Sequence, residues 1–321
     1  MAGLGRRPLV LAWLFALAVV FCDTTTTVDE TAARLSGLTP DPTPLTITNA
    51  THYFVSNERR LDLFADDVHD LGGVYVGVGS DQSYVFMGWA RPRLAVLVDF
   101  DQGIVDLHAV YRVLFEHAHD PEAFAAAWAE SGAPVAEAAI EAAVPDDIHR
   151  ERLLALYREA RPLVHARLAI MRVKMAEAER RWFLDDAGQY AHVRALHVQG
   201  RVVALRGDFT QPGVLNEVAR TLVEAQLPVR VLYLSNIEQY FTYGKAYKAN
   251  VLALPIDDRS VVLRTLPARP AGFEYIVQSA TDFRAWLGAR GVYSVYRVRG
   301  YRKGEPLVAG ERHVLTGPPG A

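Results

Sequence analysis

The sequence contains a single cysteine, Cys22, among its 321 residues. One cysteine excludes an intramolecular disulfide, and its place near the amino terminus leaves the rest of the chain without a thiol for a zinc cluster or for nucleophilic catalysis. An excess of charge of one sign is also missing, since 34 lysines and arginines face 37 aspartates and glutamates. This balance argues against a dedicated nucleic-acid-binding surface, although it leaves room for a local basic patch, and we expect no nucleic-acid partner.

Several motifs of known chemistry are absent as well. The chain has no HExxH zinc motif, no Walker phosphate loop and no GxSxG nucleophile elbow. His117, His119 and Asp120 could approach a metal ion, but the end of a helix explains them better, and we predict no metal site. Apolar residues are plentiful at 50% of the chain, which is enough for a globular core.

The one long apolar run lies at the amino terminus. Arg6 and Arg7 precede an apolar segment that ends at Cys22, in the order of a secretory signal. The segment is shorter than the ~20 residues of a membrane-spanning helix. Its last residues, VVFC, resemble a bacterial lipoprotein cleavage box, although Phe21 stands where a small residue is usual. We predict an exported or cell-envelope protein with Cys22 as a candidate lipidation site and membrane attachment. The alternatives are an uncleaved anchor or a misplaced start codon before a cytoplasmic protein.

Composition divides the chain into four parts. Residues 1–22 form the predicted leader, and residues 23–50, rich in Thr, Asp and Pro, are predicted to be a flexible linker. Residues 51–300 carry the periodic patterns of a folded domain. Residues 301–321 mix charge, Gly and Pro and are predicted to be a flexible tail.

Within residues 51–300, short apolar segments alternate with amphipathic helical patterns. A first helix is predicted to open at residues 56–59 and to run to Val68. Strands are predicted at residues 74–78, 94–99, 202–205, 229–234, 261–266, 274–277 and 293–298. This alternation predicts an α/β fold with a Rossmann-like, seven-stranded, mostly parallel sheet and crossover helices such as residues 212–225.

Residues 120–199 carry no strand pattern. Val164, Leu168, Met171 and Met175 recur at spacings of four and three, which predicts a helix with a core-facing stripe, and Pro162 should kink or interrupt it. We therefore predict an α-helical insertion. It could cap a ligand cleft, or it could be a stabilising appendage or a dimerisation surface.

Polar residues follow the first predicted strand, at the end where open α/β sheets bind ligands. Gly77 and Gly79 would let the backbone approach a ligand closely, because neither has a Cβ. A helix that begins near Ser80 and Asp81 would point free N–H groups at an anion. The alternative is a tight strand-to-helix turn without a ligand.

The next strand ends carry polar residues too. Asp99 ends the second strand about 20 residues after the glycines, which suits the hydroxyls of a ribose, although it or Asp101 could instead cap a helix. Asp208, after the third strand, could accept a hydrogen bond from an adenine amino group or cap the helix that Pro212 begins. The polar loop at residues 235–240 follows the fourth strand and is predicted to join the site rather than to be a plain solvated loop.

Four segments together resemble a bacterial protein family of uncharacterised activity that is similar in topology to S-adenosylmethionine-dependent methyltransferases. They are residues 72–84 (GGVYVGVGSDQSY), 88–101 (GWARPRLAVLVDFD), 205–210 (LRGDFT) and 232–240 (LYLSNIEQY). The resemblance extends over residues 57–298. It implies a sheet of methyltransferase type and S-adenosylmethionine as the cofactor.

The resemblance also implies roles for particular residues. The positions that match the superfamily are Gly77, Gly79, Asp99, Asp208 and Asn236, and the full set of candidate cofactor-binding residues is Gly77, Gly79, Ser80, Asp81, Asp99, Asp208 and Ser235. The superfamily's usual acid ahead of the glycines is absent, because Tyr75 and Val76 stand there.

Methyl transfer would need a group that removes a proton from the acceptor. Glu238 is the candidate base and Asn236 the candidate residue that orients the acceptor, while Tyr84, Gln239 and Tyr240 would line the substrate site. The alternative function is an exported, lipid-anchored Rossmann-type protein that binds a small molecule without methyl transfer. The predicted leader keeps this alternative open, because S-adenosylmethionine is made in the cytoplasm.

Overall fold

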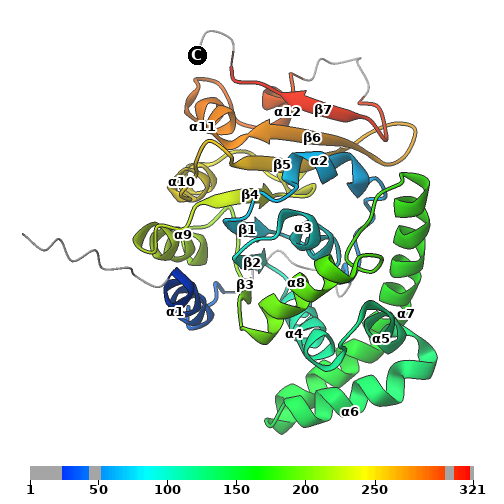
Figure 1. Cartoon of the computed structure of the whole chain (residues 1–321). Helices are drawn as coiled ribbons and strands as arrows, with labels where there is room; N and C mark the ends of the chain where they lie inside the picture. The colour runs from blue at the N-terminus through cyan, green and yellow to red at the C-terminus, as the bar shows by residue number, and fades with distance from the viewer. Residues whose placement is uncertain (1–23, 43–51, 301–306, 319–321) are drawn as a thin grey trace, which may run out of the picture.

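A seven-stranded sheet in the order β3-β2-β1-β4-β5-β6-β7 runs through the middle of the molecule (Figure 1). The structure is a computed structural model that describes residues 24–42, 52–300 and 307–318. The predicted leader and Cys22 lie outside the described residues. The strands are β1 (Val74–Gly77), β2 (Leu94–Asp99), β3 (Val202–Arg206), β4 (Val229–Tyr233), β5 (Val261–Pro267), β6 (Phe273–Ser279) and β7 (Arg312–Leu315).

The first five strands, β1 to β5, run parallel to one another. Strand β6 is antiparallel to β5, and β7 is parallel to β6. The predicted Rossmann-like, mostly parallel α/β fold is therefore confirmed. Because β1 to β5 run the same way, their carboxyl ends share one edge of the sheet, which we term the carboxyl edge. The strand order reverses between β1 and β4, which is the place where such sheets bind ligands.

Helices cover both faces of the sheet, as parallel strands require. On one face lie α1 (Thr24–Ser36), α9 (Val214–Glu224), α10 (Lys245–Ala253) and α11 (Ala280–Gly288) (Figure 1). The other face packs against α3 (Gln82–Ala90), α4 (Gln102–His117) and the helices of the insertion. Strands β1 and β2 are buried on both sides, which is why their sequences are apolar throughout except for the terminal Asp99.

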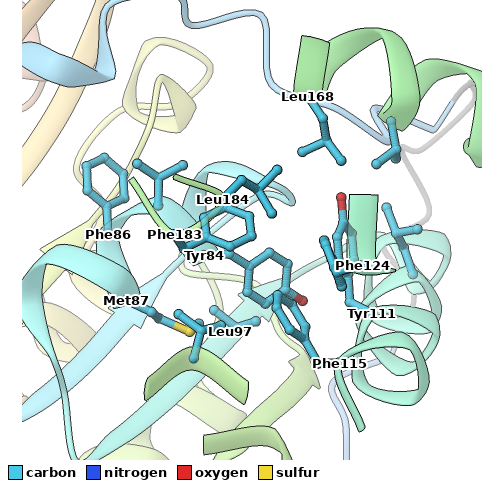
Figure 2. Packing of buried hydrophobic residues seen from close by; sticks show 14 of the residues in the cluster. Tyr84, Phe86, Met87, Leu97, Tyr111, Phe115, Phe124, Leu168, Phe183 and Leu184 are labelled. Atoms are coloured by element: carbon cyan, nitrogen blue, oxygen red, sulfur yellow. The ribbon is translucent and has the colours of Figure 1, made fainter. Parts of the chain in front are cut away.

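The insertion at residues 120–199 is helical throughout its regular elements, as predicted. It comprises α5 (Pro121–Trp128), η2 (Glu130–Gly132), α6 (Ala133–Ala143), α7 (Asp147–Glu177) and α8 (Ala187–Val198). Figure 2 shows Leu168 of this insertion beside aromatic residues of α4 and α5, and the predicted stripe on α7 is buried in that core. Pro162 lies inside α7 without interrupting it. The buried residues on both sides of the proline, Ala160 and Val164, hold the helix on the core.

Two predicted flexible segments contain regular structure. Residues 24–36 of the predicted linker form α1, with Val28, Ala32 and Leu35 buried. The spacing of four and three between these residues is helical, and the Thr-rich composition hid it. The predicted tail contains β7, with Leu315 buried. The predictions of a flexible linker and a flexible tail were wrong over these residues.

Two further elements differ from their predictions. Residues 293–298 do not form a strand but lead into the short helix α12 (Val295–Val298), because Val295 and Val298, three residues apart, both face the core. The helix predicted from residues 56–59 begins later, as η1 (Leu61–Phe64) and α2 (Ala65–Val68). Within the described residues, none of the helices combines the length and the apolar character needed to cross a membrane.

Candidate functional site

The carboxyl edge brings together the glycine turn after β1 and the acid that ends β2. Gly79 has φ of +82°, a conformation that glycine adopts without strain. Its N–H donates to Asp99 Oδ2 at 3.3 Å, and the Asp101 N–H donates to Asp99 Oδ1 at 3.0 Å. The predicted proximity of Gly79 and Asp99, 20 residues apart, is therefore present in the fold.

Asp99 is half-buried and electrostatically unusual. The pKa of its carboxyl is raised to about 6. Burial is the largest cause and the charge of Asp101 adds to it, while backbone N–H groups that donate to the carboxylate lower the pKa. Phe100, next to it, has a 45% exposed side chain. Asp101 caps α4 by accepting from the Gly103 N–H at 2.8 Å, and its other partner is His52 Nδ1 at 2.7 Å. The capping role predicted as an alternative thus belongs to Asp101, and the half-buried Asp99 accepts from the backbone of the glycine turn and of Asp101 instead.

The glycine turn is filled by the chain's own side chains. A Cβ on Gly77 would stand 2.4 Å from the Tyr75 hydroxyl, and a Cβ on Gly79 would stand 2.2 Å from Gln82 Nε2. Gln82 Oε1 accepts from the Ser80 N–H at 3.1 Å. Both glycines are therefore required by the packing of this turn. The turn holds Tyr75 and Gln82 where a ligand was predicted.

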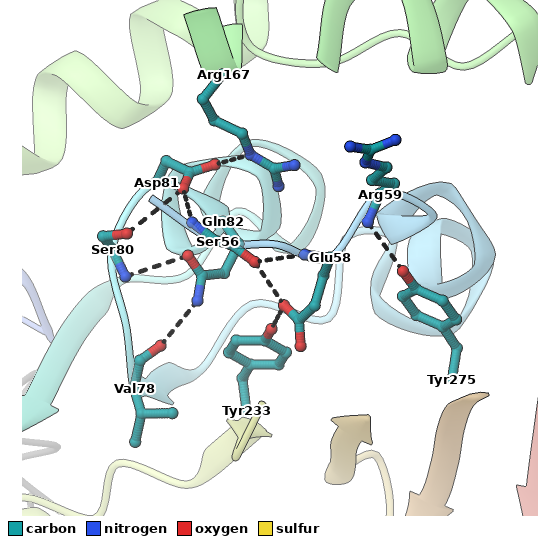
Figure 3. A network of polar contacts seen from close by, with 10 residues as sticks. All are labelled: Ser56, Glu58, Arg59, Val78, Ser80, Asp81, Gln82, Arg167, Tyr233 and Tyr275. Carbon is teal, nitrogen blue, oxygen red and sulfur yellow. Dashed lines mark hydrogen bonds and ion pairs between the residues drawn. The ribbon is translucent and has the colours of Figure 1, made fainter. Parts of the chain in front are cut away.

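Asp81 and Ser80 are also enclosed rather than open to a ligand. Asp81 Oδ2 accepts from Arg167 Nε at 2.8 Å, and both side chains are 4% exposed. Asp81 Oδ1 accepts from the Ser56 N–H at 2.7 Å. Arg167 belongs to α7, so the insertion contacts the glycine turn directly (Figure 3).

Glu238, the predicted base, lies in a closed ion pair. Its Oε2 stands 2.8 Å from Arg264 Nε, and the two side chains are 1% and 0% exposed. Its Oε1 accepts from the hydroxyls of Tyr243 and Tyr247 at 2.5 and 2.7 Å. The side chain therefore points into the core beneath the loop. The prediction that Glu238 serves as a base is not compatible with this burial.

The other predicted residues of the substrate site are dispersed. Tyr84 is buried in the core of the insertion side, where its hydroxyl donates to His108 Nδ1 at 2.7 Å, and it does not wall the site as predicted (Figure 2). Tyr240 has a 75% exposed side chain. Asn236 and Gln239 are half-exposed at the ends of η3 (Ile237–Gln239).

At the end of β3, a residue from the amino-terminal segment takes the capping role. Asp41 Oδ1 accepts from the Val214 N–H of α9 at 2.9 Å, and Asp41 Oδ2 accepts from the Asp208 N–H at 3.1 Å. Asp208 Oδ1 instead accepts from the N–H and the hydroxyl of Thr210, each at 2.7 Å. Asp208 therefore does not cap α9, and its half-exposed carboxylate closes a local turn.

The residue that sequence reasoning missed is Glu58. Its carboxylate is 1% exposed and accepts hydrogen bonds from hydroxyl groups of Ser56, Tyr233, Ser235 and Thr265. Tyr233 ends β4, Ser235 follows it, and Thr265 lies in β5, so Glu58 is buried against these two neighbouring strands. Figure 3 shows Glu58 beside Tyr233. No pattern in the sequence pointed to this role, because Glu58 is 175 positions away from Tyr233.

The residues between 53 and 310 match the model of a family described as a domain of unknown function, DUF7790. The chain belongs to this family. No curated protein matches the chain. The DUF7790 match begins within the segment that carries Glu58 and includes every site residue described above except His52 and Asp41.

The glycine turn of the DUF7790 domain does not fit the methionyl part of S-adenosylmethionine. The turn is filled by Tyr75 and Gln82, and its acid Asp81 is paired with Arg167. Asp99, at the end of β2, is an acceptor of the kind that binds ribose hydroxyls in such sheets. Among the described residues, no cluster of three or more His, Cys, Asp or Glu side chains could hold a metal ion.

Proposed function

We propose that this protein binds a nucleoside-type small molecule at the carboxyl edge, without methyl transfer. The observation that carries the proposal is Asp99, a half-buried carboxylate at the end of β2 that faces the Gly79 N–H. A carboxylate at this position in a doubly wound sheet accepts hydrogen bonds from ribose hydroxyls. The exposed ring of Phe100 offers a surface on which a base can stack.

Two further observations favour binding over methyl transfer. The predicted base, Glu238, is enclosed by Arg264 and two tyrosines, so it cannot take a proton from an acceptor. The predicted leader also favours an exported protein, which would be separated from cytoplasmic S-adenosylmethionine. Export and lipidation of Cys22 are predicted from the sequence and belong to this proposal. Cys22 itself lies outside the described residues.

S-adenosylmethionine-dependent methyl transfer is the second candidate. It is supported by the gathering of the matched positions at one edge of the sheet, where Gly77, Gly79, Asp99, Asp208 and Asn236 all follow parallel strands. This candidate requires Tyr75 and Gln82 to leave the glycine turn and requires a base other than Glu238.

Isothermal titration of the full chain with adenosine, S-adenosylmethionine and S-adenosylhomocysteine separates the two candidates. We expect all three to bind with similar affinity, because only their shared nucleoside part is accommodated. Asp99→Ala should weaken binding by about tenfold to a hundredfold, the effect of losing a charged hydrogen-bond acceptor. Asp147→Asn, an 81% exposed carboxylate on α7, is the matched control and should bind like the wild type.

The binding should depend on pH in a direction set by Asp99. Protonation removes its acceptor charge, so affinity should fall as the pH is lowered through about 6, the pKa of Asp99. At pH 5 only about a tenth of the groups would be ionised, which predicts roughly tenfold weaker binding. Tighter binding of S-adenosylmethionine than of adenosine would support the second candidate. If the protein is folded and none of the three ligands gives heat of binding, both candidate functions are contradicted.

A further inference from the structure

The irregular segment at residues 52–60, which we term the strap, crosses the carboxyl edge and is held there by polar contacts. The Ser56 N–H donates to Asp81 of the glycine turn at 2.7 Å. The N–H groups of Arg59 and Arg60 both donate to the Tyr275 hydroxyl on β6, at 3.0 and 2.9 Å. The strap thus runs from the glycine turn to β6 (Figure 3).

The Glu58 side chain points inward from the strap and is buried, and hydroxyl groups donate hydrogen bonds to it. Its Oε1 accepts from Ser235 Oγ at 3.0 Å and from Thr265 Oγ1 at 2.5 Å. Its Oε2 accepts from the Tyr233 hydroxyl and from Ser56 Oγ at 3.0 Å. No described Lys, Arg or His forms an ion pair with Glu58, so the buried carboxylate is held by hydroxyl donors.

Three of the four donors belong to the sheet rather than to the strap. We use the term hydroxyl triad for Tyr233, Ser235 and Thr265. Tyr233 is the last residue of β4, Ser235 lies just after it, and Thr265 lies within β5. Burial, and the charge of Glu58 after it, raise the pKa of Tyr233 well above its ordinary value, so the phenol stays protonated and donates. Ser235 has φ of +48°, which is uncommon outside glycine and costs backbone energy. The sheet therefore holds three donors, one of them on a strained residue, around a single carboxylate.

We propose that the hydroxyl triad is a carboxylate-binding subsite and that Glu58 occupies it as an internal competitor. The triad is held by β4, β5 and the turn after β4, while its occupant is on a segment without regular structure. A small molecule with a carboxylate group would take the place of Glu58 and release the strap from the sheet. The free energy of ligand binding must offset the free energy of the Glu58 contacts that are lost. The strap therefore raises the ligand concentration at which the subsite fills.

Acetate is the matched probe, because Glu58→Ala removes a CH₂–COO⁻ group of about the size of acetate. Acetate should raise the melting temperature of Glu58→Ala in a concentration-dependent manner, and it should leave the wild type unchanged at the same concentrations. Acetamide, the neutral isostere, and chloride at equal ionic strength should have no such effect. Adding Thr265→Val to Glu58→Ala should abolish most of the rise. Equal stabilisation by acetamide, or no effect of acetate on folded Glu58→Ala, would overturn the proposal.

A second measurement follows the strap itself and stays informative if Glu58→Ala folds poorly. Glu58→Gln keeps the shape of the side chain but removes its charge, so tryptic cleavage after Arg59 or Arg60 should accelerate by about tenfold. Acetate at high concentration should accelerate the same cleavage in the wild type, and acetamide should not. Tyr53→Ala, at a 75% exposed position of the strap, is the control and should be cleaved like the wild type.

A cleavage rate that changes neither with Glu58→Gln nor with acetate would show that the strap is a fixed part of the fold. This result would refute the competitor role. Neither measurement uses a nucleoside. A failure here is therefore distinct from a failure of the binding proposed at Asp99.

Discussion

At the scale of single residues, the most unusual environment is that of His197. The ring is buried on α8 and stacks on Phe115 with centroids 4.7 Å apart. Neither ring nitrogen has a hydrogen-bond partner among the described residues. Burial, more than the nearby His108 and Arg112, lowers the pKa of His197 to about 3. A neutral imidazole thus lies among buried aromatic rings without a hydrogen-bond partner among the described residues.

We expect His197→Phe to stabilise the protein by about 1–3 kcal/mol at pH 7, because it removes buried polar atoms that have no partner. The gain should grow as the pH falls. In the unfolded chain the histidine binds a proton near pH 6.5, and in the folded chain only near pH 3, so acid in this window favours unfolding of the wild type. Urea unfolding between pH 7 and pH 4.5 measures both effects. A less stable variant, or a gain that does not change with pH, would contradict this account.

The predicted site residues show what residue patterns can and cannot reveal. Gly79 and Asp99 were predicted to share a site because each lies at the carboxyl end of a parallel strand, and the backbone alone brings such ends to one edge of the sheet. Glu238 and Tyr84 were assigned to the site by their place in the chain. Their side chains turn inward because Arg264 and His108, distant in sequence, supply the partners.

At the scale of elements, the insertion and the glycine turn are joined by a buried ion pair. Arg167 of α7 and Asp81 are both 4% exposed, and one nitrogen of Arg167, Nη2, has no hydrogen-bond partner among the described residues. Removing one partner of such a pair leaves a buried charge without compensation. The pair therefore couples the position of α7 to the conformation of the turn.

Arg167→Met should destabilise the protein by about 3–5 kcal/mol, because it strands the Asp81 carboxylate. Asp81→Asn combined with Arg167→Met should recover a large part of this loss, since no charge then remains buried. A double-mutant cycle from denaturant unfolding gives the coupling, and Arg158→Met, an exposed residue on the same helix, is the control. Additive effects of the two changes would show that the ion pair does not connect the elements.

Elements were predictable where a periodic pattern and a buried face coincide. The five parallel strands and α9 met that condition. Helix α1 did not, because its apolar residues are few and lie within a Thr-rich segment. The strap shows no period at all, and its position depends on Asp81, Tyr233 and Tyr275, which come from three separate parts of the chain.

At the scale of the whole molecule, β7 completes the sheet at the far side from the insertion. It pairs with β6 over four residues, and Leu307 and Leu315 are buried against the same face as α11. The Thr316 carbonyl also accepts from Trp286 Nε1 at 2.7 Å. Without β7, the hydrogen-bonding edge of β6 would be exposed, and exposed edges pair with other chains.

A chain that ends at Gly300 should therefore be less stable and prone to aggregation. The burial of Leu307 and Leu315 contributes about 1.5–3 kcal/mol each to the free energy of unfolding. A chain that ends at Pro318 retains β7 and every contact described for this region, and serves as the control. Thermal unfolding and size-exclusion chromatography measure the two effects. A monomeric chain that ends at Gly300 with an unchanged melting temperature would contradict the structural role of β7.

By itself, the sequence determined the fold class, the positions of the five parallel strands along the chain, and the strand ends at which polar residues collect. Hydrophobic periodicity is local, and a parallel sheet with covered faces follows from it. The tertiary structure decided which of those polar groups face solvent. Glu238 and Asp81 form ion pairs with buried arginines, and Gln82 packs in the glycine turn. Glu58 accepts hydrogen bonds from the hydroxyl triad. Those outcomes depend on the pairing of charges and hydrogen bonds between segments far apart in the chain, because a buried polar group is stable only where a partner from elsewhere meets it.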